Sequence, residues 1–406
     1  MTSLSPSASA APRKWPTIGV LVVAELLSMG VWFSASAVVP ALSAAWSLND
    51  TGRASLTMAV QAGFALGALT LAILNLADRA RTDRLFALSA VLASVSTALI
   101  PALAGGLAAA LCLRFLTGFC LAGVYPVGMK IVATWTLKDR GLGIGLLVGA
   151  LTIGSAGPQF LNAVGGLHNW RFVLYFAAML AAIGGLLVAL FVRSGPYGGR
   201  AARFRWDYLR VLLGQRALLL ANLGYLGHMW ELYAMWAWLA LFLTAALKSA
   251  LIASWLAFAA IAAGGPASVL AGLLADRWGR TRTTSLAMTV SGACALAIGW
   301  FYDAGPLWLG AIAIVWGFAV VADSAQFSAC TSELCEPEYI GTALTLQNSL
   351  GFFLTMVTIR LVPQVERWVG TRWSLAFLAI GPALGILAML TLRGRPEAKR
   401  IASGRG

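Results

Sequence analysis

Charged side chains are scarce in this sequence. Asp, Glu, Lys and Arg make up 11% of its 406 residues, and only two residues are histidine. A soluble domain carries about a quarter charged residues. The shortage excludes an ordinary soluble domain, and it leaves few groups for the acid–base chemistry of a soluble enzyme.

A phosphate-binding loop and a cysteine framework are also missing. The glycine-rich run "GLGIGLLVG" at Gly141–Gly149 lacks the lysine of such a loop and follows no strand, which argues against an ATP-driven pump. We expect no disulfide, no metal site and no cofactor. The cysteines fall in apolar segments or at their ends, at Cys112, Cys120, Cys294, Cys330 and Cys335.

Long apolar runs are what the sequence does contain. Hydrophobic residues make up 60% of the chain, and about 20 apolar residues in a helix cross a bilayer core about 30 Å thick. The runs are apolar on every side, whereas barrel strands alternate. We therefore predict an all-α integral membrane protein with twelve transmembrane helices. The expected spans are Trp15–Pro40, Ala54–Leu76, Leu85–Ala104, Leu107–Val127, Gly141–Val164, Phe172–Val192, Ala217–Leu243, Leu251–Ala275, Ser285–Tyr302, Leu307–Phe327, Thr342–Val362 and Trp373–Leu392.

The basic residues predict how the chain is oriented. With the N-terminus inside, the inner connections hold 21 Lys and Arg residues and the outer connections hold five. Lys130 is counted with the buried charges. Positive loops stay in the cytoplasm, so we expect both termini there and the protein in the cytoplasmic membrane. Topology then explains most of the net charge of +14, and no nucleic-acid partner is needed.

The expected organisation is two six-helix bundles joined by a cytoplasmic linker. The linker sequence "RFRWDYLRVLL" interleaves basic, aromatic and aliphatic residues, which suits an amphipathic helix lying on an anionic membrane face. We expect a monomer. The predicted parts are a disordered cytoplasmic tail (1–14), the first bundle (15–193), the linker (194–216), the second bundle (217–393) and a second cytoplasmic tail (394–406).

Two similar segments indicate that the two bundles are repeats. "LNLADRARTDR" at Leu74–Arg84 and "GLLADRWGRTR" at Gly272–Arg282 each contain an Asp-Arg pair, and their aspartates, Asp78 and Asp276, are 198 residues apart. Internal repeats are typical of secondary transporters. Each repeat has an even number of spans, so both copies should cross the membrane in the same direction.

The second of these segments resembles the loop signature of the major facilitator superfamily, in which glycine, an Asp-Arg pair, glycine and a basic residue follow at fixed spacing. The fourth span, "RFLTGFCLAGVYP", and the segment "DRGLGIG" are also similar to that family. The resemblance implies a gate that forms on one side of the membrane. A simpler reading is that these charges only enforce topology. The residues assigned to the gate are Asp78, Arg79, Arg140, Gly272, Asp276, Arg277, Gly279 and Arg280.

Several ionisable residues lie deep in the expected spans, where they are functional candidates. At about 1.5 Å per residue, Glu25 is about 15 Å from the inner start of the first span and Arg114 about 11 Å from the outer start of the fourth. Those depths permit an ion pair. Asp323 and Gln326 share a face of the tenth span, and the repeat places Asp323 on Tyr125. The resemblance implies that both of these positions line the inner cavity.

The seventh span, "GYLGHMWELYAMWAW", carries the least expected polar pair. His228 and Glu231 lie about 18 Å and 22 Å into the helix, and an offset of three residues places them on one face. Because no basic residue is evident beside Glu231, we predict a proton relay formed by this pair; a polar pair that locks the helix to a neighbour is the alternative. The aromatic Tyr233 and Trp236 are candidates for contact with a planar or cationic solute.

These features predict a proton-coupled secondary active transporter that moves a small organic solute by alternating access. Its partners would be the solute, protons and the lipid bilayer. Two directions stay open, because the Glu25 and Arg114 pair resembles that of proton-coupled drug exporters, whereas Arg114 with Lys130 would also suit uptake of an organic anion. A membrane sensor or a membrane-embedded enzyme is the alternative outside transport.

Overall fold

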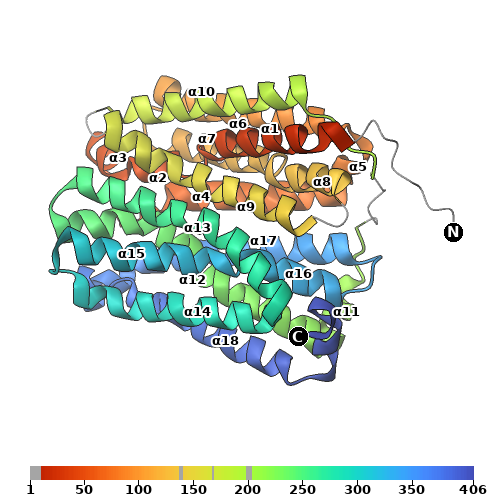
Figure 1. The fold of residues 1–406 in the computed structure, drawn as a ribbon. Helices are drawn as coiled ribbons and strands as arrows, with labels where there is room; N and C mark the ends of the chain where they lie inside the picture. The colour runs from red at the N-terminus through yellow and green to blue at the C-terminus, as the bar shows by residue number, and fades with distance from the viewer. Residues whose placement is uncertain (1–10, 137–139, 167–168, 198–203) are drawn as a thin grey trace.

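The computed structural model describes residues 11–136, 140–166, 169–197 and 204–406. Within them, eleven helical segments are long and apolar enough to cross a membrane. The helices lie side by side in two groups, with α1 to α10 in the upper part of Figure 1 and α12 to α18 in the lower part. The prediction of an all-helical, multi-pass membrane protein is confirmed.

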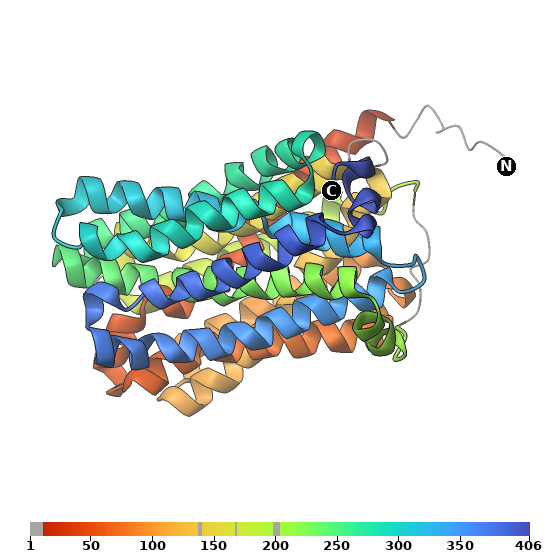
Figure 2. The same ribbon diagram turned by 90° about the horizontal axis from the view of Figure 1, so that it is seen from below.

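The start of α1 and the C-terminus lie at the same end of the molecule, which we call the terminal end (Figures 1 and 2). The opposite end is called the far end. The helices of the N-terminal half are α1 (Ala11–Met29), α2 (Ser34–Ala37), α3 (Val39–Trp46), α4 (Asp50–Ile73), α5 (Leu76–Arg79), α6 (Thr82–Leu103), α7 (Leu107–Leu121), α8 (Tyr125–Trp135), α9 (Arg140–Leu161), the π-helical η1 (Asn162–Gly166) and α10 (Trp170–Phe191).

The C-terminal half follows a linker that contains the short helix α11 (Tyr208–Gly214). Its helices are α12 (Arg216–Leu247), α13 (Ala250–Trp278), α14 (Arg280–Ala297) with the 3-10 turn η2 (Ile298–Phe301), α15 (Gly305–Ala322), α16 (Ser324–Leu334), α17 (Ile340–Val369), η3 (Thr371–Trp373), η4 (Ala376–Ala379) and α18 (Ile380–Arg393). Two 3-10 turns close the described chain, η5 (Pro396–Arg400) and η6 (Ala402–Gly404).

The predicted tail over residues 1–14 is wrong for its last four residues, which form the first turn of α1. Pro12 fits there because the first turn of a helix needs no backbone N–H donor, and Arg13 and Lys14 favour the helix. Residues 1–10 lie outside the described residues. The segment after α18 also folds, since Ala398 and Ile401 are buried.

Three spans that the sequence predicted as continuous are interrupted in the structure. The first breaks between Met29 and Ser34. The fourth breaks between Leu121 and Tyr125, where proline in the first turn of α8 supplies no N–H for the preceding turn. The tenth breaks at Asp323. Breaks at membrane depth free backbone carbonyls, which then need partners within the protein.

Equivalent helices of the two halves begin 198 residues apart. Thr82 begins α6 and Arg280 begins α14, and the same interval separates Leu107, at the start of α7, from Gly305, at the start of α15. The segments after the breaks, α8 and α16, are each 11 residues long. The structure therefore repeats the predicted spacing, and it repeats the break as well.

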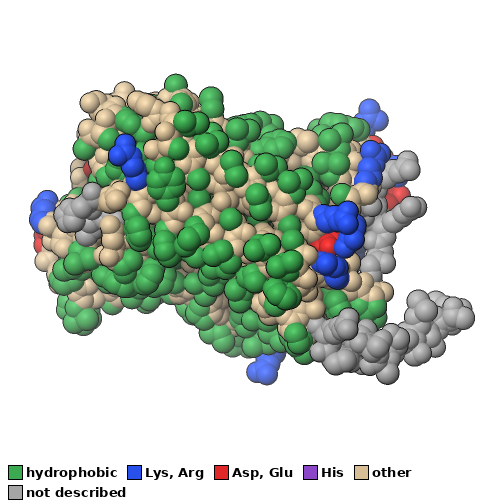
Figure 3. All heavy atoms as spheres, turned by 90° about the horizontal axis from the view of Figure 1, so that it is seen from above, with side chains coloured by type: hydrophobic (Ala, Val, Ile, Leu, Met, Phe, Trp, Pro, Cys, Tyr) green, Lys and Arg blue, Asp and Glu red, His purple; other side chains and the backbone are tan. Residues whose placement is uncertain are grey.

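The two halves pack along α9 against α13 and along α4 against α17. Small residues permit the close approach: a Cβ added to Gly149 would lie 3.3 Å from the carbonyl oxygen of Gly265. On the face seen in Figure 3, hydrophobic side chains cover most of the sides of the molecule, as expected of a surface that faces lipid.

Candidate transport site

Arg114 of α7 holds the break in the first span. Its guanidinium is fully buried and donates to the carbonyl oxygens of Val31, Trp32 and Leu56 and to the Ser34 hydroxyl, with 2.8 Å to Val31. The carbonyls of Val31 and Trp32 belong to the interruption between α1 and α2, where the helix itself offers no donor. The arginine replaces those missing donors.

Glu25 of α1 is fully buried, and neither of its carboxyl oxygens has a hydrogen-bond partner among the described residues. The predicted ion pair with Arg114 is not formed, because the guanidinium is engaged with backbone carbonyls. Glu25 faces α8 instead, since a Cβ added to Gly128 would lie 3.0 Å from its Oε2. Glycine at that position leaves space for the carboxyl group, one turn after Tyr125.

His228 of α12 pairs with the residue at the break in the tenth span. Its Nδ1 lies 2.8 Å from Oδ1 of Asp323, and its Nε2 lies 2.9 Å from the Ser324 hydroxyl. The side chains of His228 and Asp323 are each 2% exposed. The two side chains thus lie within ion-pair distance, whereas the sequence predicted His228 beside Glu231 and Asp323 beside Gln326.

Glu231 faces the interior of its own half. It accepts hydrogen bonds from the Ser291 hydroxyl of α14 at 2.8 Å and from the indole N–H of Trp316 of α15 at 2.6 Å. The predicted relay between His228 and Glu231 is therefore not formed by direct contact. Two donors satisfy this carboxyl group, which is the arrangement expected of a polar group that joins neighbouring helices.

Aromatic side chains from both halves meet beside the break in the first span. The ring of Trp32 lies 5.9 Å from Tyr233 and 5.5 Å from Phe352. Phe33 lies 6.0 Å from Tyr233 and 5.6 Å from Trp236. Both aromatic residues predicted in the seventh span therefore lie at the boundary between the halves, at separations typical of interacting rings.

Several uncharged polar groups of the N-terminal half were not predicted from the sequence. They are buried and have polar atoms without hydrogen-bond partners among the described residues, which is unusual for a folded protein. The signal was present as glutamine and serine inside apolar spans of the N-terminal half, where only Glu25, Arg114 and Tyr125 were predicted as site residues. The missed residues are Trp32, Gln61, Ser155 and Gln159, and the predicted Trp236 also has an unpartnered indole N–H.

The surroundings of Gln61 and Gln159 place these two residues toward the boundary between the halves. Gln61 lies on α4 between Thr57, whose hydroxyl is 2.6 Å from that of Ser36, and Phe64, whose ring is 4.7 Å from Trp32. Gln159 lines a cavity of about 80 Å³ formed by residues of both halves. A solute at the boundary would therefore meet ring faces together with uncharged donors and acceptors.

Side-chain bonds between the halves lie in the middle and at the far end of the molecule. Within the described residues, none of the hydrogen bonds or ion pairs that join the halves is at the terminal end. The bonds are Ser349 to the carbonyl of Ala65 at 3.4 Å, Asn162 to Ser254 at 3.0 Å and Arg367 to Asp50 at 2.5 Å.

In the loop motif Gly272–Arg280, the side chain of the last residue makes the contacts to α16. Arg280 forms an ion pair with Glu333 of α16 at 2.7 Å and donates to Gln326 at the same distance. Asp276 and Arg277 are exposed. Gln326 therefore belongs to this motif and is not paired with Asp323.

The chain after α18 packs on the same motif. Gly279 has φ of +96°, and a Cβ added there would overlap the carbonyl oxygens of Arg405 and Gly406. The hydroxyl of Thr281 donates to Gly406 at 3.0 Å. The segment predicted as a tail is thus docked against the turn that glycine makes possible.

The first copy of the motif makes fewer described contacts. Arg79 ends α5 and is exposed, whereas the side chains of Asp78 and Arg140 lie outside the described residues. Lys130 donates to the carbonyl oxygen of Ala77 at 2.6 Å and so ties α8 to α5.

A family model described as Major Facilitator Superfamily matches residues 21–359. The chain belongs to the major facilitator superfamily. It is therefore placed in a family of transporters, and its membership agrees with the resemblance seen in the loop motif. A comparison with curated protein sequences gives no match.

Solved structures of this superfamily share the fold. The chain is similar to a D-xylose–proton symporter with a TM-score of 0.76 and 16% identity, covering 96% of this chain and 99% of that one. It is also similar to a bacterial homologue of the human lysosomal transporter Spinster, inward-facing and unoccupied, with a TM-score of 0.71 and 16% identity, covering 95% of this chain and 99% of that one. A variant of the nucleoside transporter NupG is similar with a TM-score of 0.70 and 14% identity, covering 93% of this chain and 99% of that one.

Proposed function

We propose that this protein is a secondary active transporter that couples movement of a small, neutral, ring-bearing solute to protons across the cytoplasmic membrane, with both termini in the cytoplasm. The observation that carries the proposal is the boundary site. There, buried polar atoms of Trp32, Gln61 and Trp236 lack partners and adjoin stacked rings from both halves. A bound solute would supply the missing partners.

Glu25 is the proposed proton carrier. An unpaired carboxylate at membrane depth is costly, and taking up a proton removes the charge. The space beside Gly128 holds the carboxyl next to the break in the fourth span, so movement of α8 would change its surroundings and release the proton. Glu231, which the sequence analysis favoured, already accepts two hydrogen bonds.

The chemistry of the boundary site favours a neutral solute over an organic anion. Arg114 is engaged by backbone carbonyls, and the remaining groups are indole, amide and hydroxyl. Ring faces suit sugars, nucleobases and other flat molecules. D-xylose, named for one structural neighbour, and nucleosides, named for another, are neutral hydroxyl-bearing ring compounds.

The pattern of bonds between the halves supports alternating access. Bonds such as Arg367 to Asp50 hold the far end together, while the terminal end has its described bonds inside each half, such as Arg280 to Glu333. We propose that the reverse state breaks the far-end bonds and brings the loop motif against the opposite half.

The test is transport by the full-length protein in sealed vesicles, with a panel of a pentose, a nucleoside, an aromatic cation and an aromatic carboxylate. We expect an imposed pH gradient to drive accumulation of a neutral ring compound, and the direction of the gradient distinguishes symport from antiport. Glu25→Gln should abolish accumulation but keep counterflow, because exchange of solute needs no net proton movement. Accumulation by Glu25→Gln equal to wild type would contradict the proton role.

Two tryptophans provide a matched control for solute binding. Trp236 has an unpartnered indole N–H at the boundary, whereas Trp238 donates to the carbonyl of Ile359 at 3.1 Å. Trp236→Phe should raise KM by about tenfold, the effect of one lost hydrogen bond in a dry site. Trp238→Phe should lower thermal stability and leave KM unchanged. Equal effects of both substitutions on KM would remove Trp236 from the site.

A further inference from the structure

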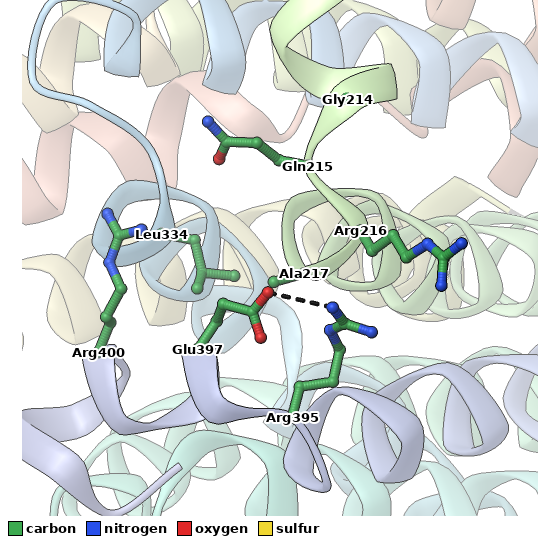
Figure 4. Close-up of a pocket in the computed structure, with 8 residues that line it drawn as sticks. All are labelled: Gly214, Gln215, Arg216, Ala217, Leu334, Arg395, Glu397 and Arg400. Carbon is green, nitrogen blue, oxygen red and sulfur yellow. Dashed lines mark hydrogen bonds and ion pairs between the residues drawn. The ribbon is translucent and has the colours of Figure 1, made fainter.

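A second cavity lies at the terminal end, away from the boundary between the halves. Its volume is about 410 Å³. In Figure 4, Arg216 at the start of α12 stands on one side, Arg400 of η5 on the other, and Arg395 and Glu397 between them. The cavity is therefore built where the seventh span begins and the chain leaves the last span.

The lining of the cavity has an excess of positive charge. Arg395 donates to Glu397 at 3.1 Å, and this bond holds the pKa of Glu397 below its usual range, so the pair is ionised and neutral overall. Nε of Arg395 and Oε2 of Glu397 are buried without partners among the described residues. Arg216 and Arg400 form no ion pair with any described residue, so each contributes a positive charge that its own chain does not balance.

The start of α12 adds further donors. This helix is 32 residues long, and its N-cap residue Gln215 makes no side-chain capping bond. The first backbone N–H with an acceptor inside the helix is that of Leu219, which bonds to Gln215. The N–H groups of Arg216 and Ala217, which line the cavity, are left for another acceptor, and the helix dipole favours an anion there.

We propose that this cavity binds a phosphate-bearing anion, either the headgroup of an anionic lipid or a free phosphate compound. Two unbalanced arginines and free N–H groups at a helix start are the donors that phosphate requires. The neighbouring segment suits a lipid surface, because Trp206, Leu209 and Leu213 are 75%, 54% and 66% exposed while Tyr208 on the same segment is buried. The site is separate from the solute site.

The test uses the purified full-length protein in detergent at fixed ionic strength, with the midpoint of thermal unfolding as readout. The probes are sodium phosphate, glycerol 3-phosphate, dioctanoyl phosphatidylglycerol and dioctanoyl phosphatidylcholine, each compared with sodium chloride. The variants are Arg216→Gln and Arg400→Gln. Both residues are exposed and unpaired, so their replacement should leave the fold intact. Arg282→Gln removes an exposed arginine of α14 that does not line the cavity and is the control.

We expect a saturable rise in midpoint with a phosphate-bearing probe, and a Kd about tenfold weaker in each cavity variant but unchanged in Arg282→Gln. A rise with phosphatidylglycerol alone identifies a lipid headgroup, and a rise with glycerol 3-phosphate or phosphate identifies a free compound. The proposal is overturned if none of the three anionic probes exceeds sodium chloride and phosphatidylcholine, or if the cavity variants bind as tightly as the control.

Discussion

Arg114 donates a hydrogen bond to the carbonyl oxygen of Val31 at 2.8 Å, and this contact joins the fourth span to the break in the first. An arginine suits the position because its planar fork can serve several acceptors at once and stays charged when buried. Carbonyl dipoles therefore compensate the charge of Arg114, and Glu25 has no ion pair with it.

Replacing Arg114 should destabilise the protein irrespective of Glu25. Arg114→Gln removes the donor to the Trp32 carbonyl and one of two donors to the Val31 carbonyl. A buried carbonyl left unpaired costs about 1–3 kcal/mol, so the substitution should lower the thermal midpoint in detergent. Arg114→Lys should restore little, because an ammonium group lacks the fork. If Glu25→Gln were to rescue Arg114→Gln in the double variant, the two side chains would be coupled after all.

Glu231 should act as a structural acceptor. Glu231→Leu strands the N–H of Trp316 and the hydroxyl of Ser291, so we expect a lower thermal midpoint than for Glu231→Gln, whose amide oxygen can still accept from the indole. Uphill transport should persist in Glu231→Gln at a rate within about threefold of wild type, because the acceptor is retained. If Glu231→Gln lost accumulation but kept counterflow, Glu231 would be the proton carrier.

Gly279→Ala should release the segment that follows α18. Its φ of +96° and the nearby carbonyls of Arg405 and Gly406 leave no space for a methyl group. We expect faster proteolysis after Lys399 in the folded protein. Gly272→Ala is the control, since a Cβ there meets nothing within 4 Å. Equal protease resistance of the two variants would show that the segment is held by other contacts.

The linker should stay docked through mild acid. Asp207 accepts from Arg205 at 2.8 Å and from Tyr339 at 3.0 Å, and chiefly the hydrogen bond from Arg205 lowers its pKa to about 2. Because the pKa of Asp207 is lower in the folded protein than in the unfolded chain, where it is about 3.9, its ionised form stabilises the fold. This stabilisation is complete above about pH 3.9 and is lost as the pH falls toward the folded pKa. Cleavage at Arg205 should therefore be constant from pH 7 to 5, and Asp207→Asn should speed it throughout that range. A rise in wild-type cleavage between pH 7 and 5 would argue against this carboxylate as the clasp.

Hydropathy and the spacing of the Asp-Arg pairs were enough to predict the spans and the repeat, because each span must satisfy its own backbone bonds in lipid. The break after Met29 could not be predicted in the same way. Its freed carbonyls accept from Arg114, which comes from a distant part of the chain, and the Val31 carbonyl also accepts from the Ser34 hydroxyl at 2.9 Å. Local sequence does not encode that contact.

The partners of the buried polar residues were equally hidden. An offset of three residues places His228 and Glu231 on one side of a helix, but the neighbouring helices determine which groups they meet. Asp323 lies at the start of α16 and reaches His228 from there. Trp316 reaches Glu231 from α15. Face and depth follow from sequence, whereas partner identity follows from packing.

The breaks before α8 and after α15 bear on the alternating access proposed above. A continuous helix resists bending, since a sharp kink must pull apart successive backbone hydrogen bonds. At the two breaks the α-helical pattern gives way to tighter turns, in which the N–H of Gly123 bonds to Cys120 at 2.8 Å and that of Gln326 bonds to Asp323 at 2.9 Å. We therefore expect α8 and α16, each 11 residues long, to bend most easily at these points. Because the two breaks occupy matching positions in the two repeats, we expect bending of α8 and of α16 to be related by the same rotation that relates the two halves.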